Sequence, residues 1–296
     1  MSRNRWHQWT LSMRFDGNKT VQVHTLIAPS SDQCSSTTSR LTIILLSTPQ
    51  NVEFRHVIRH SWASRDRLAK FNFTLIFVLS GARSLSRDRL SGLRQEHSQF
   101  HDLLLFDLPE SYAMLQRKTA AAVAFLVQAC TCGAYLKTDD NVMVSLERAD
   151  QLLRTKVRPQ LRTIHGLCRT KAVAMRQGKW AIPHSVWPYA NLPRYCLGGG
   201  QLITRPALVS LLANMHRVPD VQVEDVWLTG FVAERALVRR VSIEPPEWTS
   251  TDRSRVHACN VGRQLAYHSD AVVEPGTIQK WWSNYAKMMN ASCSNL

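Results

Sequence analysis

The sequence predicts an α/β fold in which a mostly parallel sheet is flanked by helices. Short apolar runs indicate buried strands, and longer stretches with apolar residues at helical spacing separate them. Because strand and helix alternate along the first half of the chain, the strands are expected to pair in parallel, with helices on both faces. The expected strands and helices follow one another at 41–47, 52–68, 73–80, 85–100, 102–107, 112–130 and 134–138.

Each of these elements has its own signal. The first strand is a continuous apolar run that stops just before Pro49, as a strand buried on both faces does. The helix after it repeats apolar residues every three or four positions as far as Trp62. Gly81 closes the second strand, a charged amphipathic helix and a short third strand follow, and the next helix is rich in alanine. The fourth strand runs directly into Asp139.

The second half of the chain is less regular. A segment rich in tryptophan and proline at 177–193 is expected to be irregular, and a short strand is expected at 201–204. Pro206 suits the first turn of a helix, where its missing N–H has no partner to lose. The remaining expected elements are helices at 206–215, 223–235 and 278–289 and a strand-like stretch at 236–243.

Composition narrows the class of protein. The 296 residues are 44% hydrophobic and 20% charged, which is ordinary for a globular chain and not for a disordered one. The net charge of +15 favours an acidic partner, such as nucleic acid, a membrane surface or a phosphate-bearing ligand; the alternative is a basic, solvated surface. The seven cysteines lack the paired spacing of a zinc site, and their odd number leaves at least one thiol outside any intramolecular pair.

Targeting signals are sparse. The first 40 residues contain neither a secretory signal nor a membrane span. The longest uncharged run, 119–136, is interrupted by polar residues and is better explained as a buried helix followed by a strand. Sequons at Asn18, Asn72 and Asn290 would accept glycans if the chain entered the secretory pathway.

An acidic cluster follows the fourth strand. Asp139, Asp140 and Asn141 place two carboxylates and an amide at a strand end, and ligands of parallel sheets bind at the carboxyl ends of the strands. Hard divalent cations prefer such oxygen ligands, and a cation placed there can bridge a diphosphate. The alternative is a solvated acidic turn, because aspartate and asparagine are also turn residues.

Three further motifs are candidates for chemistry. Asp225, at the expected start of a helix, is either a helix cap or a general base. The glycine run 198–200 lets backbone approach a ligand closely, but it matches neither the dinucleotide fingerprint nor the P-loop. Arg55 and Arg59, which share a helix with Trp62, could meet a phosphate or lie on the surface beside a core tryptophan.

Together and in this order, the motifs resemble those of the β-1,3-galactosyltransferases, inverting enzymes of glycosyltransferase family 31. Residues 55–62 (RHVIRHSW) resemble the family's R-x-x-I-R-x-T-W element, and 137–142 (KTDDNV) resemble K-x-D-D-D-V. The positions that match a D-L-L-x-x-D-x-x-D-x-Y-x-N-L-x-x-K element are Asp102, Leu103, Leu104, Asp107, Glu110, Tyr112, Leu115 and Lys118. The last two resembling segments are 192–200 (LPRYCLGGG) and 224–226 (EDV). The resemblance covers 41–243.

The resemblance implies a GT-A type, Rossmann-like fold, a UDP-sugar donor, Mn²⁺ and a type II membrane protein of the Golgi apparatus. By position, it implies Asp225 as the catalytic base. The implied metal ligands are Asp139, Asp140, Asn141 and, as a histidine beyond the base, His257, with His268 as the second candidate. The implied donor-binding residues are Arg55, Arg59, Trp62, Lys118, Asp139, Asp140, Gly199, Gly200 and Glu224.

The implied organisation is a polar N-terminal segment at 1–40, a catalytic domain at 41–245 and a C-terminal extension at 246–296 that packs on the domain or trails it. The implied reaction moves galactose or an N-acetylhexosamine from UDP to a glycan hydroxyl on a glycoprotein or glycolipid. Asp225 would take the hydroxyl proton while the oxygen attacks the anomeric carbon from the opposite face, which gives a β-1,3 linkage.

Two positions depart from the family pattern, and no membrane anchor is seen in the sequence. Asn141 replaces the last aspartate of the D-D-D motif, and an amide oxygen binds a cation less strongly than a carboxylate does. Met114 replaces an asparagine. Asn141 motivates a second hypothesis, a catalytically silent member that binds UDP-sugar or glycan. The net charge motivates a third hypothesis, a basic nucleic-acid-binding protein, although the motifs themselves predict no nucleic-acid partner.

Overall fold

The computed structural model describes residues 10–15, 19–35, 37, 39–243, 265–267 and 274–290. The described residues form a nine-stranded sheet in the order β1-β2-β5-β4-β3-β6-β11-β8-β12. Its four central strands are parallel neighbours: β5 (Leu103–Phe106), β4 (Phe73–Leu79), β3 (Leu41–Leu46) and β6 (Ala134–Asp139). The predicted α/β fold with a mostly parallel sheet is confirmed.

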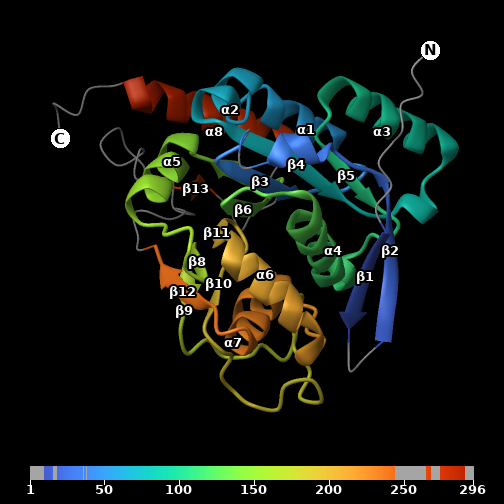
Figure 1. The fold of residues 1–296 in the computed structure, drawn as a ribbon, viewed down its shortest axis with the longest axis vertical. Helices are drawn as coiled ribbons and strands as arrows, with labels where there is room; N and C mark the ends of the chain where they lie inside the picture. The colour runs from blue at the N-terminus through green and yellow to red at the C-terminus, as the bar shows by residue number, and fades with distance from the viewer. Residues whose placement is uncertain are drawn as a thin grey trace.

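Helices cover both faces of the sheet (Figure 1). On one face lie α1 (Val52–Arg59), α2 (Arg65–Phe71), α3 (Arg87–Phe100), α5 (Leu146–Thr155) and α8 (Pro275–Asn290). On the other lie α4 (Leu115–Ala129), α6 (Arg205–Asn214) and α7 (Ala233–Arg235). Side chains of each central strand alternate between two cores, so Ile44 and Ile76 face the α4 side while Ile43 and Leu75 face the α1 side.

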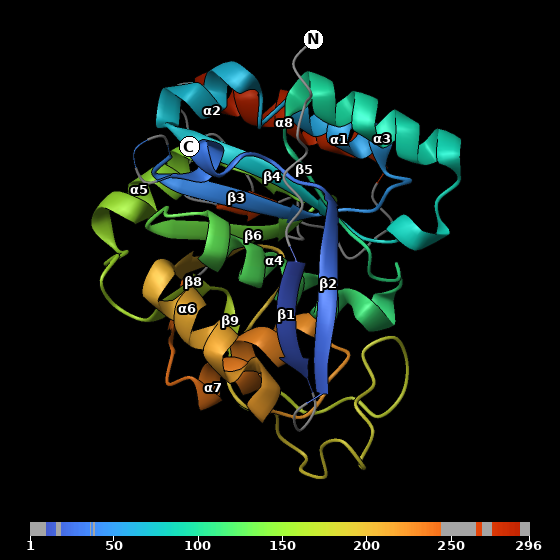
Figure 2. The same ribbon diagram turned by 45° about the vertical axis from the view of Figure 1, so that its right-hand side comes forward.

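The sheet is extended at both edges by strands of other directions. Antiparallel to β6 lies β11 (Gln201–Thr204), followed by β8 (Thr163–Gly166) and β12 (Arg239–Ser242). At the opposite edge, a hairpin adds β2 (Lys19–Ile27) and β1 (Thr10–Phe15), and Figure 2 shows it in blue alongside α4, against which β1 packs. Shorter pairs are β9 (Cys168–Arg169) with β10 (Tyr195–Cys196), and β7 (Met143–Val144) with β13 (Ala266–Tyr267).

Both ends of the described chain belong to this body. The segment 1–40, expected only as a polar segment, contributes β1 and β2, because Leu11, Val23 and Ile27 are apolar and fully buried. Within 246–296, α8 packs against α1, and the hydroxyl of Tyr285 lies 2.8 Å from the Ser145 Oγ. Among the described residues, no helix has the length and apolarity needed to cross a membrane.

Two expected helices differ in detail. The helix predicted at 52–68 is two helices, α1 and α2, because the chain turns between them and carries Trp62 fully into the core. The helix predicted at 223–235 is a π-helix at Val226–Val232 that continues into α7. π-Helical turns are rare and frequent at functional sites, and this one begins directly after Asp225.

Two disulfides link distant segments. Cys34 pairs with Cys130, which fastens the N-terminal segment to the end of α4, and Cys168 pairs with Cys196. Among the described residues Cys132 is the cysteine left as a thiol, and it is buried. The second disulfide joins β9 to β10, the short strand that leads into the glycine run.

Candidate active site

The acidic cluster lies at the carboxyl end of β6, where Asp139 is the last residue of the strand. Asp140 is turned toward the neighbouring strand β3. Its N–H donates to the Leu46 carbonyl at 3.1 Å, and its Oδ2 accepts from the Ser47 hydroxyl at 2.7 Å and the Asn51 amide at 2.8 Å. Asp140 therefore ties two parallel strand ends together, and Asp139 is left to face the site.

An ion pair fixes the helix of Asp225 against the sheet. The Lys137 ammonium lies 2.9 Å from the Glu224 carboxylate, and both side chains are almost fully buried. Lys137 comes from β6 and Glu224 precedes the π-helix, so the pair joins the two elements that carry the acidic residues. The carboxylate of Asp225 accepts the N–H of Val226 at 2.8 Å, which fixes the side chain at the start of that helix.

Gly198 lies next to both acidic residues. A β-carbon placed on this glycine would lie 3.7 Å from Oδ2 of Asp139 and 3.8 Å from Cβ of Asp225. The backbone N–H of Gly198 also bonds the Asp225 carboxylate. The structure thus brings Asp139 and Asp225, 86 positions apart in the chain, to one residue without a side chain. A space bounded by two carboxylates and bare backbone suits a polar ligand.

Burial raises the pKa of Asp139 and of Asp225, each to about 6. The neighbouring carboxylate of Glu224 contributes to both shifts, and the Lys137 ammonium opposes them. Three acidic side chains, Asp139, Glu224 and Asp225, thus surround the paired Lys137, and Asp140 adds its charge beside Asp139. The carboxylates outnumber the cationic groups at this site, and a bound cation would neutralise part of the excess negative charge.

The amide of Asn141 adds a further oxygen. Within the described part of the chain, its Oδ1 is buried without a hydrogen-bond donor, and so is Oε1 of Glu224. Buried polar atoms without partners are rare and call for an unplaced water or ion. Within the described ranges, no group of three His, Cys, Asp or Glu side chains is arranged to hold a metal. His257 and His268 lie outside the described residues.

Arg55 and Arg59 belong to a buried ionic network. Arg55 donates to both oxygens of Glu96, at 2.7 and 2.8 Å, and to the Thr48 carbonyl at 2.7 Å. Arg59 donates to both oxygens of Asp102 and to Glu96, each at 2.8 Å. These bidentate bonds occupy the guanidinium donors, so the network braces α1 against α3 and β5.

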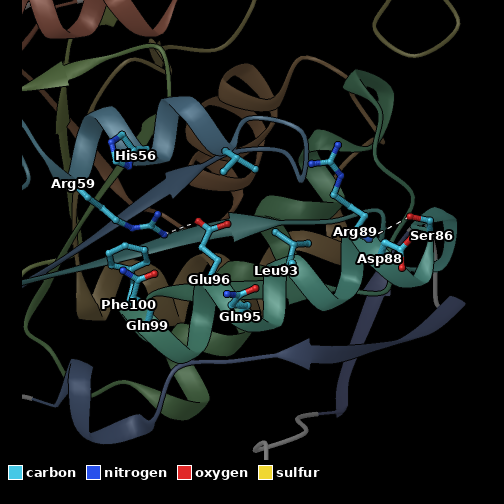
Figure 3. Close-up of a pocket in the computed structure, with 12 residues that line it drawn as sticks. His56, Arg59, Ser86, Asp88, Arg89, Leu93, Gln95, Glu96, Gln99 and Phe100 are labelled. Atoms are coloured by element: carbon cyan, nitrogen blue, oxygen red, sulfur yellow. Dashed lines mark hydrogen bonds and ion pairs between the residues drawn. The ribbon is translucent and has the colours of Figure 1, made fainter.

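Arg59 lies at a separate pocket. Figure 3 shows it pointing across to Glu96 on the facing helix α3, with its guanidinium 4.2 Å above the Phe100 ring. The pocket, about 600 Å³, shares no residue with the acidic cluster. Trp62 is fully buried in the core of the same side. In this structure Arg59 and Trp62 have structural contacts, and the donor-side role expected for them stays a prediction, while Arg55 contacts Ser47, whose hydroxyl bonds Asp140.

Lys118 and two glycines bond the segments that carry the acidic cluster. The Lys118 ammonium donates to the Ser47 carbonyl at 2.7 Å and to the Glu110 carboxylate at 2.8 Å, and burial lowers the pKa of this lysine. The carbonyl of Gly199 accepts the Thr138 hydroxyl at 3.0 Å, and Gly200 is buried. These contacts hold the end of β3 and the glycine run in place.

Sequence reasoning missed two participants. Of the glycine run that it named, Gly198 is the one beside Asp139 and Asp225, whereas the resemblance pointed to the next two glycines as donor-binding residues. Ser47 and Asn51 carry no signal on their own, but their position just past the end of β3 could have indicated them, because adjacent parallel strands end at one edge.

Comparison with known proteins identifies the family of the chain. The galactosyltransferase family model matches residues 53–244. The chain is 20% identical over 267 residues to β-1,3-galactosyltransferase 1 of Homo sapiens, covering 88% of this chain and 78% of that protein. It is 21% identical over 270 residues to β-1,3-galactosyltransferase 2 of Homo sapiens, covering 89% and 63%.

The chain is also similar to a solved structure of a glycosyltransferase involved in the glycosylation of the major capsid of PBCV-1. The match covers 82% of this chain and 98% of that chain, with 10% sequence identity and a TM-score of 0.44. The family match alone spans more than half of the 296 residues and contains every described residue that the sequence predicted for the site. This protein therefore belongs to the galactosyltransferase family and is a glycosyltransferase.

Proposed function

We propose that the chain transfers galactose or an N-acetylhexosamine from a UDP-sugar to a glycan hydroxyl, with inversion and formation of a β-1,3 linkage. One observation carries the proposal: Asp139 and Asp225 both lie within 4 Å of the position that a β-carbon on Gly198 would take. A donor diphosphate held at the end of β6 would then face a carboxylate suited to accept a proton. The names of the curated relatives support galactose as the sugar and β-1,3 as the linkage.

In this proposal Asp225 takes the proton from the acceptor hydroxyl. The hydroxyl oxygen forms a bond to the anomeric carbon as the bond from that carbon to the UDP oxygen breaks, and attack from the opposite face inverts the configuration. Glu224 and Lys137 hold the helix of the base, and the backbone N–H groups of Gly198 and Val226 hold its carboxylate. These contacts supply the fixed orientation that proton transfer requires.

A divalent cation such as Mn²⁺ fits the residues present. The buried Asn141 Oδ1 without a donor, and the excess of carboxylates beside it, form an oxygen-rich donor set of the kind hard cations take. Asp139 and Asn141 would hold the ion, with Asp140 and His257 as further candidates. When bound, the cation would stabilise negative charge on the departing diphosphate.

Asn141→Asp is expected to tighten Mn²⁺ binding by roughly tenfold, because a carboxylate replaces a neutral amide among the proposed ligands. Titration calorimetry of Mn²⁺ in the presence of UDP measures the change. Asn214→Asp is the matched control, since Asn214 lies on α6 and bonds only the Ser210 carbonyl in the described structure. Equal affinities of Asn141→Asp and the native chain would remove Asn141 from the ligand set.

Transfer is expected to fall as the pH drops through about 6. Burial raises the pKa of Asp225 to about 6, and only its ionised form can accept the proton, so activity is full above that value and lost below it. Because Asp139 interacts with Asp225, the fall in rate at low pH reports the titration of the two carboxyl groups together. The kcat/KM for the acceptor between pH 4.5 and 8 tests this. An acidic limb near pH 4, where an ordinary aspartate titrates, would contradict it.

UDP release from UDP-galactose, UDP-N-acetylglucosamine and UDP-N-acetylgalactosamine, with methyl glycosides as acceptors and with or without Mn²⁺, tests the proposed reaction. Linkage analysis of the product then identifies the bond. UDP binding without turnover on any pair would support the silent member that Asn141 motivates. Salt-dependent binding of DNA or RNA with no affinity for UDP would support the nucleic-acid alternative.

We also propose the Golgi lumen as the site of action. The disulfides Cys34–Cys130 and Cys168–Cys196 support an oxidising compartment, because such bonds are rare in the cytosol. The sequons are compatible with passage through the secretory pathway.

A further inference from the structure

Exposed aromatic side chains gather in one region of the molecule. Within the described residues, the large aromatic side chains that count as exposed are Tyr112, Trp180 and Tyr189, with 39%, 49% and 64% of their surface accessible. Trp180 and Tyr189 belong to the loop 172–192, which forms the lower edge of Figure 1 in yellow. Tyr112 begins the short 3-10 turn that directly precedes α4, and it contacts Lys179 of this loop. Large exposed aromatic groups in one place indicate a binding surface.

The loop 172–192 is held by specific bonds. Its ends pair through Ala174 N–H to the Ala190 carbonyl and Leu192 N–H to the Ala172 carbonyl, each at 2.8 Å. The Arg176 guanidinium donates to three carbonyls inside the loop, of Ile182, Trp187 and Tyr189, at 2.7 to 2.8 Å. A loop of this length without helix or strand, yet internally bonded, is typical of a functional loop.

The loop also contacts the helix of the proposed base. The Trp187 ring packs edge-on against Phe231 of the π-helix, with centroids 4.7 Å apart. Phe231 lies six positions after Asp225. The loop and the base are therefore fixed relative to one another.

Tyr112 joins this loop to the acidic site. The Trp180 side chain hydrogen-bonds the Tyr112 hydroxyl, and the Lys179 ammonium lies 4.9 Å from the centre of the Tyr112 ring. Burial, together with the Asp225, Glu224 and Asp139 carboxylates, raises the pKa of Tyr112 to about 12. Glu110, two positions before Tyr112, accepts from the Lys118 ammonium, which also donates to the carbonyl of Ser47, the residue that bonds Asp140. These contacts place the pair formed by Tyr112 and Trp180 next to the acidic cluster, with Trp180 the more exposed of the two.

We propose that Trp180 is the stacking surface for the pyranose ring of the acceptor and that Tyr112 positions it beside Asp225. The proposal rests on the proposed function, because an acceptor hydroxyl must lie within hydrogen-bond distance of the base. The rest of that sugar must then cover the surface next to Asp225. A pyranose presents an apolar face of C–H groups together with hydroxyls, and an exposed indole edged by a phenol hydroxyl and an ammonium matches both.

The test is initial-rate kinetics of the full chain with UDP-galactose and methyl β-N-acetylglucosaminide or methyl β-galactoside. Trp180→Ala is expected to raise the KM of the acceptor roughly tenfold, with the KM of the donor unchanged. Trp180→Phe is expected to recover most of this loss, because it keeps a flat ring. Tyr112→Phe, which removes only the hydroxyl that bonds Trp180, is expected to raise the acceptor KM by a smaller factor and to leave the midpoint of thermal unfolding unchanged.

Tyr189→Ala is the matched control. Tyr189 is more exposed than Trp180 and lies in the same loop, but its ring contact is with Trp187 and not with Tyr112. Normal acceptor KM in Tyr189→Ala together with a raised value in Trp180→Ala supports the proposal. A raised donor KM in Trp180→Ala would instead place the uracil base on the indole and overturn it, as would an unchanged acceptor KM.

Failure of the proposed function is distinguishable from failure of this inference. If the native chain transfers no sugar, titration calorimetry of the same methyl glycosides in the presence of UDP and Mn²⁺ replaces the kinetics. Binding that Trp180→Ala weakens and Tyr189→Ala preserves supports the aromatic surface without the reaction. No binding by the native chain, or equal binding by both variants, overturns it.

Discussion

Asp225→Asn is expected to lower kcat for sugar transfer by about 10²- to 10⁴-fold while the affinity for UDP stays within about twofold, the range that loss of a general base spans. Asparagine keeps the size of the side chain and an oxygen that can accept the N–H of Val226, so the start of the π-helix is preserved. It cannot take a proton from an acceptor hydroxyl. Initial rates of UDP release with acceptor, paired with UDP titration calorimetry, measure the two effects separately.

Asp220→Asn is the control for this variant. Asp220 accepts hydrogen bonds from Gln116 and Arg117, away from the acidic site, so its amide variant is expected to retain native rates. Comparable losses of UDP affinity and of rate in Asp225→Asn would give Asp225 a structural role. Native rates would remove it from the reaction altogether.

Arg59→Met is expected to lower the free energy of unfolding by about 3–5 kcal/mol, with UDP affinity of the folded protein unchanged. The substitution leaves Asp102 without its bidentate partner and Glu96 with one partner fewer, in a site where both carboxylates are largely buried. Burial already raises the pKa of Asp102 despite the guanidinium, so the loss of Arg59 forces that carboxyl either to ionise alone or to take up a proton. Urea unfolding measures the change.

The double variant Arg59→Met with Asp102→Leu is expected to recover part of the lost stability, because removing both partners of a buried pair costs less than removing one. Reduced UDP affinity in Arg59→Met without reduced stability would indicate that Arg59 takes part in binding the donor. It would also imply that the pocket between α1 and α3 in Figure 3 takes part in donor binding.

The central sheet could be predicted from the sequence because its strands are short apolar runs that require no knowledge of partners. Residues 41–46 and 134–139 fall within one residue of their predicted limits. The N-terminal hairpin could not, since β2 pairs with β5 about 80 positions away and its alternation is partly polar. The break between α1 and α2 also escaped, because helical spacing continues through Trp62 although tertiary packing turns the chain there.

Part of the candidate site could likewise be predicted from the sequence, and part could not. Asp139 and Asp225 were identified from motifs, and the glycine run between them was identified as a place of close approach. Which glycine faces the carboxylates depends on how β10 leads into β11, and local sequence does not fix that. The ionic network of Arg59 could not be predicted, because its partners come from elements 37 and 43 positions away and only the fold brings them to it.

A crystal of the protein grown with UDP and Mn²⁺ tests the central claim most directly, through anomalous diffraction at the manganese edge. The account predicts one strong peak coordinated by Asp139 and the Asn141 amide, on the Gly198 side of β6, with the UDP phosphates bound to it and facing Asp225. A manganese peak and a nucleotide located elsewhere, such as in the pocket between α1 and α3, would contradict it.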